Sequence, residues 1–115
     1  MPAEVREYKT LKEFWPFYLT EHANRTNRNL HAIGSLLVIG LMITSLAMGN
    51  YWLLLALPVG GYGFAWLGHY VFEKNRPATF TYPFMSFVCD WIMLYYVLTF
   101  QVDGELEKAR KALGA

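Results

Sequence analysis

Apolar residues dominate the middle of the chain, and polar residues gather toward its two ends. From Leu30 to Phe72 the sequence contains no Asp, Glu, Lys or Arg. A continuous helix of that length would extend roughly 65 Å, about twice the thickness of a bilayer core. Two membrane spans joined by a tight turn fit this length better. Gly49-Asn50, followed by the aromatic pair Tyr51-Trp52, is typical of such a turn at the membrane surface.

The pattern predicts one all-α integral membrane domain over residues 1–115, with one interfacial amphipathic helix and three transmembrane helices. The amphipathic segment is short and aromatic, so we expect it to lie on the membrane surface. The other three helical segments are apolar and long enough to cross a bilayer. The expected elements are the interfacial helix 10–23, the spans 28–48, 51–72 and 83–100, and a polar tail over 101–115.

Local signals indicate where these helices begin and bend. Thr10 opens the capping-box pattern T-x-x-E, and Thr26 or Asn27 would cap the first span. Pro83 suits the first turn of the third span. Pro58 and the GGYG run in the second span predict a bend or a close approach to another helix.

The charged residues predict which side of the membrane each helix end faces. Arg25 and Arg28 precede the first span, Lys74 and Arg76 follow the second, and the turn between them is uncharged. Both basic clusters therefore lie on one face, which the positive-inside rule assigns to the cytosol. With three spans, the polar tail would lie on the opposite face. The residues expected beside the basic clusters are His22, His31, His69 and Glu73.

Composition narrows the classes of function. The net charge of +1 provides no basic field that would hold nucleic acid. The hydrophobic fraction of 55% and the aromatic fraction of 17% are high for a soluble domain. Cys89 is the only cysteine, which excludes an intramolecular disulfide and a cysteine-built zinc site. The first ten residues are charged and lack an apolar h-region, so no cleavable signal peptide is expected.

Three histidines on one face could ligate a metal, because imidazole binds iron, zinc, copper and nickel. His22 and His31 would point to opposite sides of one continuous helix, so they converge only if the segment between them breaks it. His69 and Glu73 are four residues apart and share a helical face, as two ligands, or a ligand and its partner, would. Two alternatives remain: headgroup-level histidines without a metal, or a haem held between His31 and His69.

The other charged residues carry less specific signals. Asp90 lies about two turns inside an apolar span, where a carboxylate is costly and marks a functional position. It could accept a hydrogen bond from an imidazole, bind the metal, or pair with Arg76. Arg25, Arg28 and Arg76 would serve either as topology anchors or as clamps for an anionic substrate.

Two stretches of the chain resemble a known family. FWPFYLTEHANRTNRNLHAIGS (residues 14–35) and GHYVFEKNRPATFTYP (residues 68–83), together with Asp90, are similar to the yeast-type endoplasmic-reticulum 2-hydroxy fatty acid dioxygenases. These enzymes act in the pathway from phytosphingosine to odd-chain fatty acids. The resemblance covers about residues 10–100. The combination of H-x8-H with G-H-x-x-x-E-K-N-R-P is specific, and the length resembles that of short bacterial members.

The resemblance implies an Fe(II)-dependent dioxygenase that uses O2 to shorten a long-chain 2-hydroxy fatty acid by one carbon. Iron with three protein ligands would keep positions open for O2 and for a chelating substrate. The acyl tail would need an apolar slot, which the kinked second span could line. The implied site comprises the iron ligands His22, His31 and His69, the catalytic candidates Glu73 and Asp90, and Arg25, Arg28 and Arg76 near the substrate carboxylate.

The implied location is a multi-pass position in the bacterial inner membrane or the endoplasmic reticulum, with the histidine face toward the cytosol. Membrane lipids would surround the spans, and the GGYG run could pack between chains of a homo-oligomer. Two other classes remain open from the residues alone. One is a non-catalytic membrane protein that binds lipid headgroups, and the other is a haem-binding membrane protein.

Overall fold

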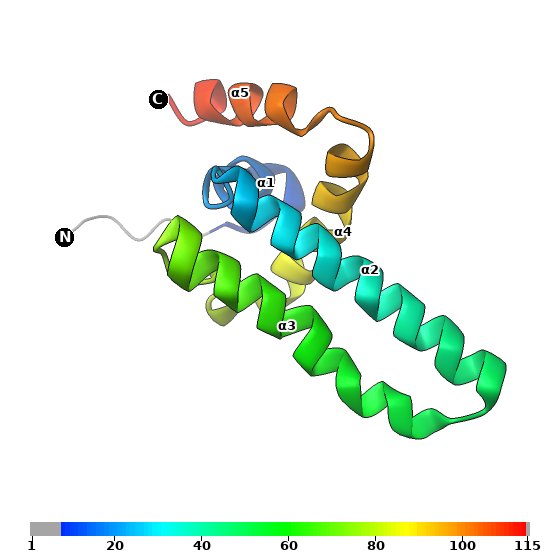
Figure 1. Cartoon of the computed structure of the whole chain (residues 1–115). Coiled ribbons are helices and arrows are strands. Elements are labelled where there is room, and N and C mark those ends of the chain that lie inside the picture. The colour runs from blue at the N-terminus through cyan, green and yellow to red at the C-terminus, as the bar shows by residue number, and fades with distance from the viewer. Residues whose placement is uncertain (1–7, 115) are drawn as a thin grey trace.

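The computed structural model describes residues 8–114, and this part of the chain contains helices and no strand. Residues 1–7 and 115, which the predicted domain includes, lie outside the described part. The elements are α1 (Leu11–Thr20), α2 (Arg25–Met48), η1 (Tyr51–Ala56), α3 (Leu57–Leu67), η2 (Gly68–Glu73), η3 (Ala78–Phe80), α4 (Pro83–Leu98) and α5 (Val102–Ala112). The all-α prediction is therefore confirmed. Figure 1 shows α2 and α3 as a long hairpin that extends from a head containing α1, α4 and α5.

The hairpin contains two helical stretches that are long and apolar enough to cross a membrane. They are Arg25–Met48, with 24 residues, and Tyr51–Glu73, with 23 residues, and the most apolar 18-residue windows of these stretches have mean hydropathies of 2.0 and 1.2. Only 22% and 11% of their most apolar windows are buried within the protein, whereas a core helix would be mostly buried. Their outward apolar faces therefore support association with a membrane. The predicted turn is confirmed, with Gly49 in the left-handed region at φ 64°.

The second helix of the hairpin is irregular at both ends. It begins as a 3₁₀-helix, η1, continues as α3 with Pro58 in the first turn, and ends as a π-helix, η2. A Cβ atom added to Gly34 of α2 would lie 2.9 Å from the Gly60 carbonyl oxygen, so the two backbones approach closely here. The predicted close approach at the GGYG run is confirmed.

Helix α4 is shorter than the predicted third span. It has 16 residues and ends at Leu98, so three membrane crossings are not established. Helix α5 packs against α1, and Asp103 at its start pairs with Arg28 at 3.1 Å and with Arg25 at 3.6 Å. The tail therefore lies beside the basic residues, and the prediction that it lies on the opposite face is wrong. The physical reason is that α5 buries its apolar stripe against α1.

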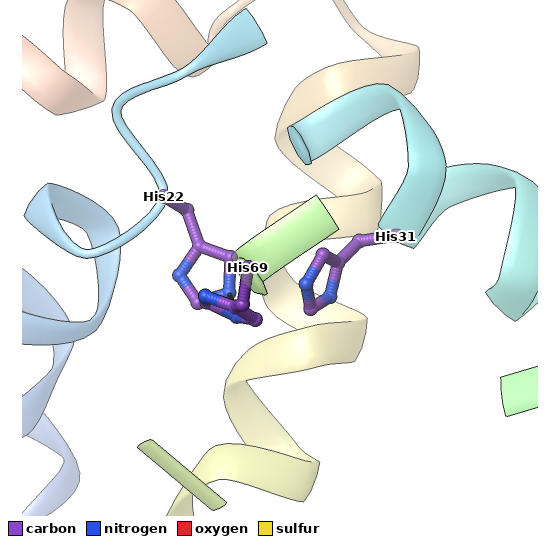
Figure 2. A group of neighbouring side chains, drawn as sticks. All are labelled: His22, His31 and His69. Atoms are coloured by element: carbon purple, nitrogen blue, oxygen red, sulfur yellow. Dashed lines mark hydrogen bonds between the residues drawn. The ribbon is translucent and has the colours of Figure 1, made fainter. Parts of the chain in front are cut away.

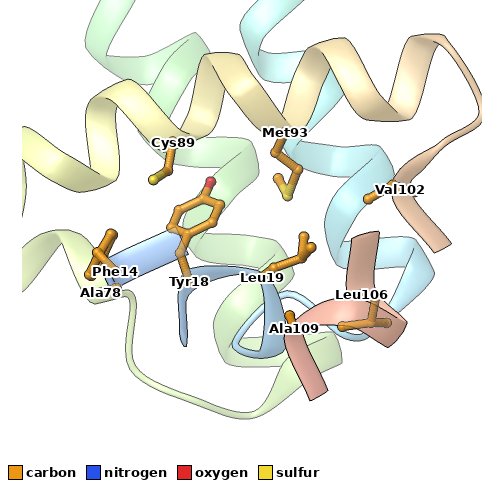
Figure 3. Close-up of a cluster of buried hydrophobic side chains, with 9 residues drawn as sticks. All are labelled: Phe14, Tyr18, Leu19, Ala78, Cys89, Met93, Val102, Leu106 and Ala109. Atoms are coloured by element: carbon orange, nitrogen blue, oxygen red, sulfur yellow. The ribbon is translucent and has the colours of Figure 1, made fainter. Parts of the chain in front are cut away.

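The core of the head joins α1, α4 and α5, as Figure 3 shows. Helix α1 was expected to rest on a membrane surface, yet it inserts three fully buried side chains into this core. Leu106 and Ala109 of α5 close the cluster on the far side of α1. The buried members are Phe14, Tyr18, Leu19, Ala78, Cys89, Met93, Val102, Leu106 and Ala109.

The caps of the first two helices differ in how well the sequence predicts them. Thr10 caps α1 as predicted, because its Oγ1 accepts a hydrogen bond from the Glu13 amide at 3.2 Å. Asn24 caps α2 by accepting a bond from the Asn27 amide at 3.1 Å, so the prediction of Thr26 or Asn27 is wrong. Its extended backbone (φ −77°, ψ 126°) is the conformation that an N-cap requires. The helix therefore begins earlier than expected.

Gly68 provides a test of how closely the two helices of the hairpin pack beside the head. A Cβ atom at this position would overlap the Asn27 carboxamide oxygen and lie 3.2 Å from the Asn27 Cα. We expect Gly68→Ala to destabilise the fold by about 1–3 kcal/mol, measured as a lower Tm in detergent. Gly63→Ala is the matched control, because a Cβ atom there meets no atom within 4 Å. Equal Tm values for the two variants would contradict the close approach.

Candidate metal centre

Three elements each bring one histidine to a common point in the head. His22 lies in the turn after α1, His31 lies in α2, and His69 lies in η2. Their ring centroids are 4.4, 4.5 and 5.0 Å apart, and one nitrogen from each ring lies within 4.8 Å of the other two. Figure 2 shows the three rings converging. The helix break predicted between His22 and His31 is confirmed, and it is what allows the two rings to meet.

Hydrogen bonds on the outer side of two rings fix their tautomers. His22 Nδ1 lies 2.7 Å from the Tyr18 carbonyl oxygen, which can only accept, so this nitrogen carries the proton. His69 Nδ1 lies 2.6 Å from the Asn75 carboxamide oxygen. Asn75 presents its oxygen to the ring because its Nδ2 donates to the Glu21 carbonyl at 3.0 Å. In both rings, Nε2 is therefore left with a lone pair that faces inward.

The inward nitrogens need a cation between them. The Nε2 atoms of His22 and His69 are 2.9 Å apart, and two lone pairs at this distance repel each other. His31 Nε2 is also buried and has no hydrogen-bond partner, a situation that typically costs about 1–3 kcal/mol. Burial, reinforced by His31 and His69, holds the pKa of His22 well below its usual value, so this ring is neutral and able to ligate. The donor set therefore fits a transition-metal ion.

Tyr18 and Asp90 form a polar pair beside the histidines. The Tyr18 hydroxyl donates to the Asp90 carboxylate, and the Tyr18 ring stacks on His22 with centroids 4.1 Å apart. Burial, followed by the nearby Asp90 charge, raises the pKa of Tyr18, so the phenol stays protonated as a donor. Asp90 Oδ1 lies 3.9 Å from His31 Nδ1, on the side of that ring away from its unpaired Nε2. Tyr18 was not among the site residues predicted from the sequence.

Glu73 has a different partner from the one its spacing predicted. Its Oε1 accepts hydrogen bonds from the Asn24 amide at 2.8 Å and from Asn27 Nδ2 at 3.1 Å, so it ties η2 to the start of α2. Asn75 takes the place beside His69. The chain returns toward His69 because Lys74 adopts a left-handed conformation with φ 60°. A lysine gives little sign of that conformation, so sequence reasoning missed Asn75.

The three arginines lie away from the inner face of the site. Arg28 is 3% exposed, and its Nη1 donates to the carbonyl oxygens of His22 at 3.0 Å and Ala23 at 2.7 Å. It therefore holds the turn that carries His22. Arg25 is largely exposed beside Asp103, and the Arg76 guanidinium lies 5.2 Å from the centre of the Phe80 ring. Of the three alternatives for Asp90, the pairing with Arg76 is not among the ion pairs of the described residues, whereas Asp90 lies near His31.

A cavity of about 370 Å³ opens directly beside the histidines. Tyr18, Asp90 and the three imidazoles line its polar end, and residues of α2, α3 and α4 form mainly apolar walls beyond them. No arginine is among the residues that line it. The arrangement places a metal-ligating site at the head of an apolar chamber, which suits an amphiphilic small molecule.

These features define a helical protein with two helices long and apolar enough to cross a membrane and a buried three-histidine site that could hold a metal ion. The family described as 2-hydroxy-palmitic acid dioxygenase Mpo1-like matches residues 8–102, and the chain belongs to this family. No curated protein and no solved structure matches the chain significantly. The family that the motifs predicted is thus confirmed, and its description makes a 2-hydroxy fatty acid the substrate class to test.

Replacing any one of the three histidines by Ala should abolish stoichiometric metal binding. The change removes one nitrogen donor from a buried set of three, and the two remaining imidazoles do not complete the metal site. Metal content after loading with Fe(II) or Co(II), and the visible spectrum of the Co(II) form, would measure the loss. Cys89→Ala, which removes a thiol from the same head without adding a hydrogen-bonding group, serves as the control. Full metal content in all three histidine variants would contradict the site.

Asn75→Ala should weaken metal binding by about 10- to 100-fold while leaving the three ligands in place. Without the carboxamide oxygen, His69 loses the bond that fixes its tautomer and ring orientation. Competition with a chromophoric chelator would measure the affinity. Asn29→Ala, an identical change at an exposed position of α2, should bind metal like the parent protein. The same affinity in both variants would show that Asn75 does not orient His69.

Proposed function

We propose that this protein is an Fe(II)-dependent dioxygenase that shortens long-chain 2-hydroxy fatty acids by one carbon. The observation that carries the proposal is the set of three inward histidine nitrogens at the polar end of an apolar cavity. Membership of a family described by a 2-hydroxy-palmitic acid dioxygenase supports the reaction class. Per O2 consumed, atom balance gives the carboxylic acid one carbon shorter, carbon dioxide and water.

The residues of the site have distinct roles in this proposal. His22, His31 and His69 would hold Fe(II), which when bound supplies activation of O2 and open positions for a chelating hydroxy acid. Tyr18 and Asp90 lie at the same end of the cavity, where their hydrogen bond can orient the acid's polar head. The apolar walls exclude water from that end.

Other predicted site residues act through position rather than through contact with the substrate. Glu73 anchors η2 to α2, and Arg28 holds the His22 turn, so both keep the histidines in place. Because no arginine lines the cavity, the metal itself is the proposed partner of the substrate carboxylate. Arg25 and Arg76 are then topology anchors at the head of the hairpin.

Both rival functions fit the site less well. A haem between His31 and His69 needs room for a flat macrocycle, whereas the centroids of these two rings are only 5.0 Å apart. The His22 ring also lies 4.5 and 4.4 Å from them. Histidines that bind lipid headgroups would be exposed, but the three rings belong to residues that are 1%, 7% and 2% exposed. These observations favour a mononuclear metal site over either alternative.

The proposed location is a membrane, with the hairpin inserted and the histidine-bearing head on the cytosolic side. The outward apolar faces of α2 and α3 support insertion, and Arg25 and Arg76 at the head support the orientation. The same faces would contact membrane lipids or a second copy of the chain.

Oxygen consumption tests the proposed reaction directly. Protein in detergent, loaded anaerobically with Fe(II), should consume one O2 per 2-hydroxypalmitic acid and release the acid that is one carbon shorter. Palmitic acid should give no uptake, because it lacks the hydroxyl needed to chelate the metal. Removal of iron with a chelator should stop the reaction, and Fe(II) should restore it. Stoichiometric iron without oxygen uptake would refute the proposal.

A further inference from the structure

The cavity beside the histidines forms a slot bounded by α2, by α3 with η2, and by α4. On the α2 side its lining residues recur at helical spacing from His31 through Ser35 and Val38 to Met42, so they share one face. The opposite wall runs back from His69 to Pro58. Each wall spans twelve residues, and the eleven helical steps between its ends correspond to a depth of about 16 Å.

Polarity changes along the depth of this slot. Tyr18, Asp90 and the three imidazoles lie at one end, whereas the far end is lined by Met42, Leu57 and Pro58. An amphiphilic ligand would bind in this slot with its polar head at the histidines and its apolar part between the helices.

Small side chains keep the slot open along its length. Ser35 on α2, together with Gly61 and Ala65 on the facing helix, presents little bulk to the space between the two walls. Phe87 and Trp91 of α4 form the third wall. A cavity of about 370 Å³ with mainly apolar walls suits a single unbranched chain better than a pair of acyl chains.

We propose that this slot takes the extended acyl chain of the 2-hydroxy acid and that its depth sets how much of the chain the protein contacts. The proposal rests on the proposed function and adds a position for each part of the substrate tail. An extended carbon chain advances about 1.25 Å per bond, so a depth of about 16 Å takes about 13 bonds. A chain of about 14 carbons would then reach Met42 and Pro58, and longer chains would emerge toward the apolar exterior of the hairpin.

Plugging the slot at two depths tests this assignment. Val38 lies seven residues beyond His31, so Val38→Trp should exclude chains longer than about ten carbons. Ser35→Phe, four residues beyond His31, should exclude chains longer than about six carbons. Excluded acids should bind roughly 5- to 150-fold more weakly, the range expected for overpacking.

Leu36→Trp is the matched control, because Leu36 is 46% exposed and lines a separate groove on another face of the hairpin. The metal-loaded proteins would be held under nitrogen with an equimolar mixture from 2-hydroxyhexanoic to 2-hydroxyoctadecanoic acid, and the retained acids identified by mass spectrometry. Metal content reports whether each variant is folded. Oxygen uptake with the same acids would be measured separately.

The profile of retained acids tests the slot, and oxygen uptake tests the reaction. A cut-off in chain length that follows the depth of the substituted residue, with a parent-like profile for Leu36→Trp, supports the slot. Profiles in Val38→Trp and Ser35→Phe that match the parent would overturn it, even if the parent oxidises the acids. Graded binding without oxygen uptake by the parent would leave the slot in place and refute the dioxygenase.

Discussion

The rest of the head is arranged around the contact between the His22 and His69 rings, because the surrounding groups must hold two facing nitrogen lone pairs together. Their Nε2 atoms lie 2.9 Å apart, and each ring's other nitrogen is committed as a donor, to Tyr18 in one case and to Asn75 in the other. Two lone pairs at this distance are stable only with a cation between them. With the buried and unpaired Nε2 of His31, the protein presents a ligand set whose own repulsion favours metal binding.

The surrounding structure holds this arrangement by joining segments that are distant in the chain. Arg28 bonds the His22 turn and pairs with Asp103, so α5 is tied to the segment that carries a ligand. Glu73 links η2 to the first turn of α2 in the same way. These bonds lie wholly within the protein, so they hold the His22 turn and the η2 segment in place around the three rings.

The outward and inner faces of the hairpin have different roles. Its outward faces are apolar over most of two long helices and suit a membrane environment. Its inner face, together with α4, lines the cavity that begins at the histidines. Gly34 permits α2 and α3 to approach closely, while Ser35 and Ala65 line the cavity beside this contact. The substrate tail would therefore contact the inner faces of these two helices, and membrane lipids would contact their outer faces.

Hydropathy and local chain signals were enough to predict the helical fold, the turn at Gly49 and the family, because each depends on neighbouring residues or on short motifs. They also predicted that the three histidines share one end of the hairpin. They did not predict that Asn75 rather than Glu73 partners His69, or that α5 folds back onto α1. Those outcomes depend on backbone conformation and on contacts between distant segments. Only tertiary packing decides them, because no local periodicity records which buried surface α5 covers.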